Sequence, residues 1–329
     1  MDTRILISCM SGTYCNHYSR TRILETIAWS FEALSTGKYP RCDPWGRPFT
    51  AQYHPHRMLV TISEWADVNP ETPLMRIPGW SPWRILPDIM HICYLACTVD
   101  VITSCLLDWS DSASLFFNGS SREKRLTQLW ENYRSWCESQ GYDLADRASR
   151  KLFSTSALKP EAGKYVEVSQ KTLNATAARY MAFWVASVSK KIAEWTGADP
   201  DMFRAGAAMG LAEIEMVCLR GGRVFSPPEW THFEFGYLVY RAGLNKMGAI
   251  ALEKKQTRWR QRPKGHGLEH LVHDFHGLNP RYCSNFLDED FVRRSKKLAI
   301  QSNARFVSKH VLFRYAIAAT LRWTDLKPE

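Results

Sequence analysis

The sequence predicts a mainly α-helical protein, α+β at most, with one irregular region rich in proline and aromatic residues. Three observations lead to this class. Apolar residues recur at helical spacing through most of the chain. Several helices in its middle have recognisable first and last residues. The 329 residues are 45% hydrophobic and 23% charged, a globular composition that argues against wholesale disorder, collagen-like repeats and coiled coils.

The first helix is expected at residues 21–34, where apolar side chains share one side and Gly37 and Pro40 follow. Residues 38–83 contain many prolines, glycines and aromatic residues, which suits an ordered but irregular connection. Residues 83–86 allow a short strand.

A long apolar helix is expected from Asp88 to about Asp108. It contains His91, Asp100 and Asp108, whereas a bilayer span needs about 20 residues largely free of such groups. We therefore expect a buried helix and no contact with a membrane.

Four further helices have local capping signals. The third of them contains residues 205–216, which are rich in alanine and glycine and would let a neighbouring helix approach closely. The four are expected at 122–140 after the cap Ser121, at 174–195 before Gly197, from the cap Asp199 to Gly221, and from the capping box Ser226 to Glu229 toward Leu252.

The positive charge is concentrated in the last quarter of the chain. In total, 43 Lys and Arg face 33 Asp and Glu, a net charge of +10. Residues 1–253 hold 27 basic and 26 acidic residues, net +1, whereas residues 254–329 hold 16 and 7, net +9. Such a concentrated field favours a polyanionic partner. We expect an N-terminal region with a truncated RNase H-like remnant at 1–110, a helical domain at 111–253 and a basic helical segment at 254–329.

Two basic runs carry this charge. Pro263 argues against a helix through the first run, so an extended arm is expected there, and Trp259 would stack on an unpaired base. Six neutralised phosphates would give a log-log salt slope of about −5 on duplex DNA. The alternatives are a solvated linker, or cations that pair with acids elsewhere in the fold. The candidate nucleic-acid-binding residues are Lys254, Lys255, Arg258, Trp259, Arg260, Arg262, Lys264, Arg293, Arg294, Lys296 and Lys297.

A row of histidines follows the first run. His266 and His270 lie four residues apart and His273 follows, which places them on one helical face with metal-ligand spacing. HGLEH, residues 266–270, also matches an inverted zinc-protease pattern. The glycines of this segment weaken the helix that such a Zn²⁺ site needs, so a packed or solvated histidine face is the simpler interpretation.

A second cluster contains Asp88, His91, Cys93 and Cys97. The Asp88–His91 and Cys93–Cys97 pairs face different ways around a helix, which disfavours zinc. Asp88 is either a helix cap or a magnesium-binding carboxylate at a strand end. The candidate metal ligands are Asp88, His91, His266 and His270.

The nine cysteines are scattered and odd in number, which indicates a reducing compartment and not a disulfide scaffold. The first residues contain no apolar run long enough for a secretory signal. We expect a nuclear or cytoplasmic protein that is not secreted.

Four short segments carry a family resemblance through their order and spacing. Residues 77–101 contain I-P-G and D-x-M-H, and residues 27–49 precede them. Residues 262–275 contain P-K-x-H-x-L-x-H, and residues 279–299 contain D-E-D-F. Together they resemble eukaryotic cut-and-paste transposases of the CACTA and KDZ kind and their degenerate genomic relatives.

The resemblance implies an RNase H-like core in which three catalytic carboxylates hold two Mg²⁺ ions for DNA cleavage and strand transfer. It places Asp88 at the second carboxylate position, with His91 beside it. Glu269 is our choice for the third, ahead of Glu289. No segment upstream of Ile27 supplies the first carboxylate, so the resemblance implies a catalytically incomplete protein.

The sequence therefore predicts a transposase-derived mobile-element protein that binds DNA or another nucleic acid. The first alternative is a non-enzymatic helical interaction or scaffold module that binds an acidic partner. The second is a zinc enzyme at His266 and His270.

Overall fold

A computed structural model describes residues 17–36, 42, 44–46, 87–111, 113–114, 116–159, 163–275, 277–302 and 306–324. The described residues are mainly helical, with 73% helix, so the predicted class is confirmed. The described residues contain no β-strand and no RNase H-like sheet. An antiparallel bridge joins Val224 to Leu278. The irregular region expected at 38–83 and the strand at 83–86 lie outside the described residues, apart from residues 42 and 44–46.

The chain forms two compact units. The larger is Leu86–Asn285, and the smaller combines Met1–Ile85 with Phe286–Glu329. These boundaries differ from those of the three expected segments, because the units follow contacts in space and the segments followed charge along the chain.

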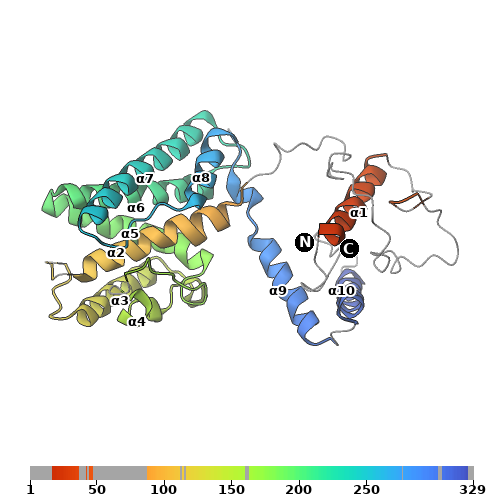
Figure 1. Cartoon of the computed structure of the whole chain (residues 1–329), viewed down its shortest axis with the longest axis horizontal. Coiled ribbons are helices and arrows are strands. Elements are labelled where there is room, and N and C mark those ends of the chain that lie inside the picture. Colours follow the sequence, from red (N-terminus) through yellow and green to blue (C-terminus); the bar gives the residue numbers. More distant parts are fainter. Residues whose placement is uncertain are drawn as a thin grey trace. The chain divides into compact units, whose positions relative to one another are not determined.

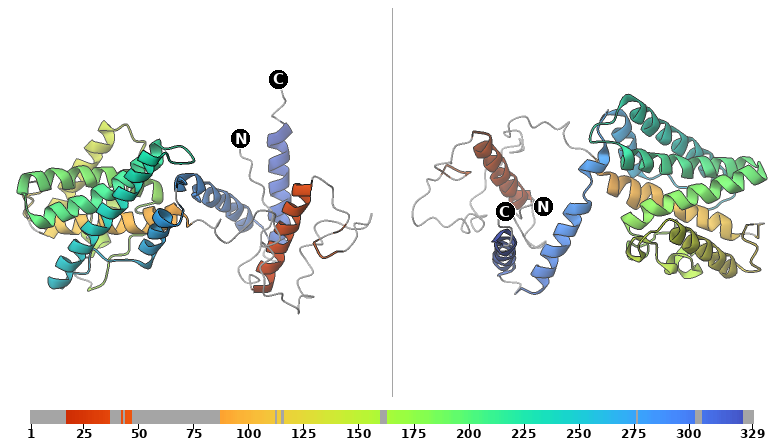
Figure 2. Two further views of the ribbon diagram at one scale, coloured as in Figure 1. Left: turned by 90° about the horizontal axis from the view of Figure 1, so that it is seen from above. Right: turned by 180° about the vertical axis from the view of Figure 1, so that it is seen from behind.

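The larger unit is a layered helical bundle (Figure 1). Helix α2 contacts α5 and α6 on one side and α3 on the other, and α6 packs along both α5 and α7. Figure 2 shows the same layering from behind. The elements are η6 (Met90–Cys97), α2 (Thr98–Asp111), α3 (Arg122–Ser139), η7 (Leu144–Asp146), η8 (Arg150–Leu152), α4 (Thr155–Leu158), α5 (Ala175–Thr196), α6 (Asp199–Arg220), α7 (Pro227–Glu253), α8 (Pro263–His273) and η9 (Pro280–Cys283).

Aromatic rings fill the core where α2, α3 and α5 meet. The ring of Trp184 lies 5.8 Å from that of Trp109 and 5.2 Å from that of Tyr133, both edge to face. Trp184 Nε1 donates to Asn132 Oδ1 at 2.9 Å, so its polar atom is satisfied inside the core.

Helices η6 and α2 form one long apolar helix, as predicted, and η6 is an eight-residue π-helix. Met90–Asp111 is long and apolar enough to cross a membrane, but 83% of its most apolar window is buried inside the bundle. Core helices of globular folds reach the same length and hydropathy, so burial explains why Met90–Asp111 is so apolar.

Helices α6 and α7 approach each other closely at glycines. A Cβ added at Gly210 would overlap the backbone of Gly236 and Tyr240, and one added at Gly243 would lie 2.5 Å from Ala207 N and Phe203 O. The Ala- and Gly-rich run at 205–216 therefore serves tight helix packing.

The predicted cap Ser121 and the predicted capping box are confirmed. Ser121 accepts from Lys124 N, and Ser226 forms the capping box with Glu229. Asn174, predicted as the first residue of its helix, is instead the N-cap of α5 and accepts from Ala177 N at 2.8 Å. The predicted cap Asp199 is wrong by one position, because Ala198 is the N-cap and Asp199 is the first residue of α6.

The smaller unit contains α1 (His17–Thr36), α9 (Phe286–Ile300) and α10 (Val307–Thr324). Helix α9 packs against α10. The Arg22 guanidinium lies 3.7 Å from the ring centroid of Trp45, whose Nε1 donates to Glu25 Oε2 at 2.8 Å. This contact ties residue 45 to α1.

Candidate functional site

The first basic run forms a strap, residues 254–262, between α7 and α8 (Figure 1). It is not helical, as Pro263 predicted, but it begins with a turn and is not fully extended, and α8 begins at Pro263. Trp259 is 2% exposed. Its backbone N donates to Ser104 Oγ and its ring Nε1 to Asp108 Oδ2, both at 2.9 Å. The predicted stacking residue is therefore a core residue that anchors the strap to α2.

Trp259 has a φ of +58°. A bulky residue in the left-handed region costs about 1–3 kcal/mol and persists only where surrounding contacts impose it. The two hydrogen bonds and the burial of the indole supply that constraint.

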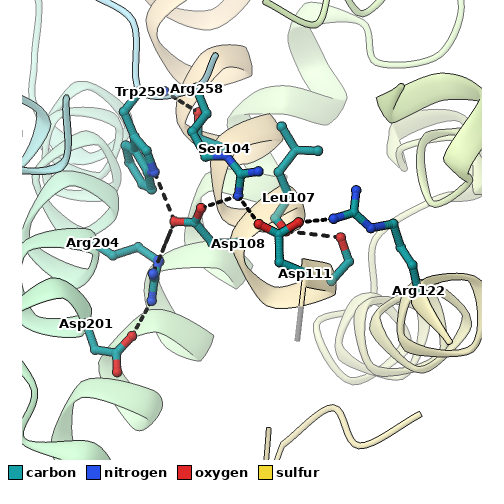
Figure 3. Close-up of polar contacts among 10 residues, drawn as sticks. Ser104, Leu107, Asp108, Asp111, Arg122, Asp201, Arg204, Arg258 and Trp259 are labelled. Atoms are coloured by element: carbon teal, nitrogen blue, oxygen red, sulfur yellow. Dashed lines mark hydrogen bonds and ion pairs between the residues drawn. The ribbon is translucent and has the colours of Figure 1, made fainter. Parts of the chain in front are cut away.

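Arg258 lies between two aspartates of α2 (Figure 3). Its Nη1 donates to Asp108 Oδ1 at 2.7 Å and to Asp111 Oδ2 at 2.6 Å. Asp108 Oδ2 also accepts from Arg204 Nε at 3.1 Å, and Asp111 pairs with Arg122. The result is a buried network of alternating charges in which each carboxylate serves more than one donor.

Arg260 and Arg262 reach a second acidic pair. Arg262 Nη2 donates to Asp100 Oδ1 at 2.8 Å and to Glu167 Oε2 at 3.2 Å. Arg260 Nη1 lies 2.7 Å from Glu167 Oε1, and its Nη2 lies 3.1 Å from Asp100 Oδ1. The sequence alone left open that cations of the first basic run pair with acids elsewhere in the fold. The structure shows this pairing for Arg258, Arg260 and Arg262.

The lysines of the first run lie outside this network. Lys254, Lys255 and Lys264 are exposed. Lys264 Nζ donates to the backbone oxygen of His91 at 3.3 Å. A nucleic-acid contact through these lysines stays a prediction.

Helix α8 presents His266 and His270 with their Nε2 atoms 3.0 Å apart. Each Nδ1 faces a carboxylate: His266 Nδ1 lies 3.2 Å from Glu269 Oε2, and His270 Nδ1 contacts Asp274 Oδ2. The hydrogen bond from His266 lowers the pKa of Glu269. Helix α8 forms despite its two glycines, so the helical face predicted for this pair is confirmed.

The rest of the histidine row is separate. The His273 ring packs edge to face on Tyr237, with centroids 5.9 Å apart, and His276 lies outside the described residues. Within the described ranges, no group of three or more His, Cys, Asp or Glu side chains is placed to hold a metal ion.

Asp88 acts as a helix cap. Its Oδ1 accepts from the backbone N of Met90 and of Asn285, both at 3.1 Å, and its Oδ2 pairs with His91 Nδ1. This is the cap interpretation of Asp88. The two-metal site predicted for Asp88 and Glu269 finds no support in the described residues, because no third ligand joins either side chain.

Cys93 and Cys97 are buried in η6. Cys93 Sγ lies 3.6 Å from Thr98 Oγ1, and burial raises the pKa of Cys97 to about 11. Thiols in such surroundings stay protonated and are poor metal ligands.

Two segments of the transposase resemblance lie side by side. Helix α8, from P-K-x-H-x-L-x-H, packs on η6, whose first two residues are the last two of D-x-M-H. A Cβ at Gly267 would lie 3.2 Å from Ile92 Cγ2, so glycine permits this close packing.

Two features, one in the core and one on the surface, were missed from the sequence. Glu215, 1% exposed, accepts from Tyr94 Oη and, at 2.8 Å, from Arg179 Nε. Burial and the charge of Glu215 raise the pKa of Tyr94. The only signal for this buried network in the sequence was the presence of polar residues inside apolar helices.

An apolar groove of about 590 Å³ lies between α5, α6 and α7. Met202, Met209 and Phe235 line it and are 47%, 41% and 60% exposed. Exposed apolar surface of this kind is typical of interaction sites. Its residues come from separate helices, so no single segment of sequence signals it.

The second basic run lies on α9. Arg293, Lys296 and Lys297 are exposed and follow i, i+3, i+4 spacing, which places them on one helical face. The side chain of Arg294 lies outside the described set. On α10, Lys309 and Arg314 are also exposed. Residues 291–324 contain eight arginines and lysines and no aspartate or glutamate.

Comparison of the chain with family models, curated proteins and solved structures finds no match. The transposase resemblance rests on the four motifs and stays a prediction.

Proposed function

We propose that this protein binds nucleic acid through the α9–α10 hairpin and that it is a transposase-derived protein without a working catalytic centre. One observation carries the proposal. Residues 291–324 hold eight arginines and lysines and no acid, and the three acids of the hairpin, Asp288, Glu289 and Asp290, lie near the start of α9. Such a surface binds the phosphate backbone by releasing counterions.

The contrast with the strap supports this choice. Both runs looked alike in the sequence, but the arginines of the strap contact Asp100, Asp108, Asp111 and Glu167 within the fold. A cation that already has a buried carboxylate partner gains little by exchanging it for a phosphate. The hairpin cations therefore carry the contact with nucleic acid.

Aromatic side chains of the hairpin add to the interaction. Phe306 and Phe313 of this segment are 50% and 65% exposed. Exposed rings beside cations stack on unpaired bases, and each stacked base contributes about 1–3 kcal/mol. Single-stranded nucleic acid is therefore expected to bind at least as well as duplex.

The experiment is a salt titration of fluorescence anisotropy with the full chain and labelled duplex and single-stranded DNA. Five cations on duplex DNA give a log-log slope of about −4 to −5. The R293Q/K296Q/K297Q variant should lower the slope magnitude by about 3. The matched control K171Q/K190Q/K191Q removes the same charge from exposed positions of the larger unit and should bind as the wild type does.

Two further arms separate the alternatives. If a K254Q/K255Q/K264Q variant loses as much affinity for DNA as the α9 variant, the first basic run also binds nucleic acid and the assignment to α9 is wrong. Poly-glutamate of matched charge tests the acidic-partner alternative, and equal affinity for it and for DNA would contradict nucleic-acid binding. Absence of DNA binding at about 50 mM salt would also overturn the proposal.

A further inference from the structure

The pair His266 and His270 has an unusual arrangement of hydrogen-bonding atoms. Their Nε2 atoms face each other at 3.0 Å, while each Nδ1 faces a carboxylate oxygen, of Glu269 and of Asp274 respectively. The rings stand at 61° with centroids 4.3 Å apart. The side chains of Glu269, His266, His270 and Asp274 thus form one continuous array of contacts on α8 and its C-cap.

The array lacks a proton when both rings are neutral. It contains three contacts, from Glu269 to His266, from His266 to His270, and onward to Asp274, and each contact needs one proton. Two neutral imidazoles carry only two. In the tautomers that let each Nδ1 donate to its ionised carboxylate, both Nε2 atoms carry a lone pair that is free to bind a cation.

A metal cation satisfies both lone pairs at once. Imidazole nitrogens bind first-row divalent metals at about 2.0–2.1 Å, so two nitrogens 3.0 Å apart subtend an angle of about 94° at the metal. That angle fits neighbouring positions of a square-planar or tetragonal centre, which Cu²⁺ and Ni²⁺ prefer. A tetrahedral zinc centre, with angles of about 109°, needs the nitrogens about 3.3 Å apart.

We propose that His266 and His270 form a two-histidine site for a divalent transition metal, with Cu²⁺ bound most tightly, and with water in the remaining positions. Glu269 and Asp274 support the site by contacting the Nδ1 atoms of the two histidines, which are not the ligating nitrogens. A carboxylate on the far ring nitrogen fixes the tautomer and makes the ligating nitrogen more basic. The two negative charges also offset the charge of the cation.

This site differs from the zinc-enzyme alternative. An H-x-x-E-H enzyme uses its glutamate as a general base beside the metal. Here Glu269 contacts His266 Nδ1, on the side of the ring away from the other histidine. The site is therefore one for binding a metal, and it is independent of the proposed binding of nucleic acid.

The test is a titration of the full chain with CuCl₂ in a buffer that does not bind copper, followed by calorimetry and by electron paramagnetic resonance. The wild type should bind one Cu²⁺ with coupling to two imidazole nitrogens. His266→Gln or His270→Gln should weaken this binding by more than tenfold, since even a partner behind a ligand contributes about 10- to 100-fold. E269Q and D274N should each weaken it by about 10-fold or more.

His273→Gln is the matched control, because this histidine lies on the same helix and packs on Tyr237 instead. It should leave binding unchanged. Equal copper affinity in the wild type and in H266Q/H270Q would overturn the proposal, as would a spectrum with one coordinated nitrogen. Parallel titrations with NiCl₂ and ZnCl₂ should give weaker binding, and tighter zinc than copper would contradict the tetragonal geometry.

Discussion

Arg258 and Asp108 are 150 residues apart in the sequence, and Nη1 of the arginine lies 2.7 Å from Oδ1 of the aspartate. This contact explains why a strongly basic segment is found in a compact fold. The excess of positive charge after residue 253 is met in space by acids of α2, in particular Asp100, Asp108 and Asp111. Charge that is segregated along the chain is partly neutralised in the structure.

Asp108 is expected to be the most sensitive member of this network. Its carboxylate accepts from Arg258, Arg204 and Trp259, and its side chain is 10% exposed. Asp108→Asn should lower the free energy of unfolding by about 1–3 kcal/mol, because it removes the charge that Arg258 and Arg204 share and leaves each with one acidic partner, Asp111 and Asp201 respectively. Urea unfolding followed by circular dichroism measures this loss. Asp143→Asn, at an exposed position, is the control, and a similar loss in both variants would contradict the prediction.

Two glycines of α6 should respond in opposite directions to alanine. Gly210→Ala should destabilise the protein by about 1–3 kcal/mol or more, because its Cβ would overlap the backbone of Gly236 and Tyr240. Gly206→Ala should stabilise it by about 0.5–1 kcal/mol, since its Cβ would lie 3.8 Å from Val239 Cγ1 and alanine favours a helix. Thermal unfolding of both variants checks the pair, and equal shifts in Tm would mean that α6 and α7 are not so close.

Lys159 is a candidate for stabilisation. It is the exposed C-cap of α4 and has a φ of +36°, in the region that glycine adopts without strain. Lys159→Gly should raise the free energy of unfolding by a few tenths to about 1 kcal/mol. Lys164→Gly, where φ is not positive, should lower it. If both substitutions lower stability, strain at residue 159 is not significant.

Cysteine labelling should separate the core from the surface. In a C9S/C15S background, exposed Cys283 should react first with a thiol reagent and half-buried Cys42 next. The five buried cysteines, whose pKa burial raises, should react only on unfolding. Mass spectrometry of labelled peptides resolves the order, and labelling of any buried member in the folded state would show that the bundle opens. These five are Cys93, Cys97, Cys105, Cys137 and Cys218.

The sequence predicted local features well, for a physical reason. A cap such as Ser121 depends on a hydrogen bond to a backbone group three residues away, so its signal lies within one turn. The buried helix from Asp88 was predicted from its composition alone. Asp199 was placed one position too far because a first-turn acid and a cap look alike in sequence.

The partners of the basic strap could not be predicted in the same way. Asp100 and Asp108 were recognised as reasons against a membrane span, but no local rule joins them to Arg262 or Arg258 about 150 residues later. The histidine pair could be predicted only in part. Spacing placed His266 and His270 on one face, whereas the nitrogen atoms that face each other depend on the carboxylates behind them.

The π-helix η6 sets the angular phase between the two ends of the long apolar helix. Thr98 N donates to Cys93 O, five residues back, so this segment holds an extra residue relative to an α-helical path. Each residue of an α-helix turns it by about 100°. If the same residues relaxed to regular α-helix with none deleted, Asp88 and His91 would turn relative to Asp100 and Asp108. Helix content would survive, but the cap and the aspartates could no longer meet α8 and the strap together.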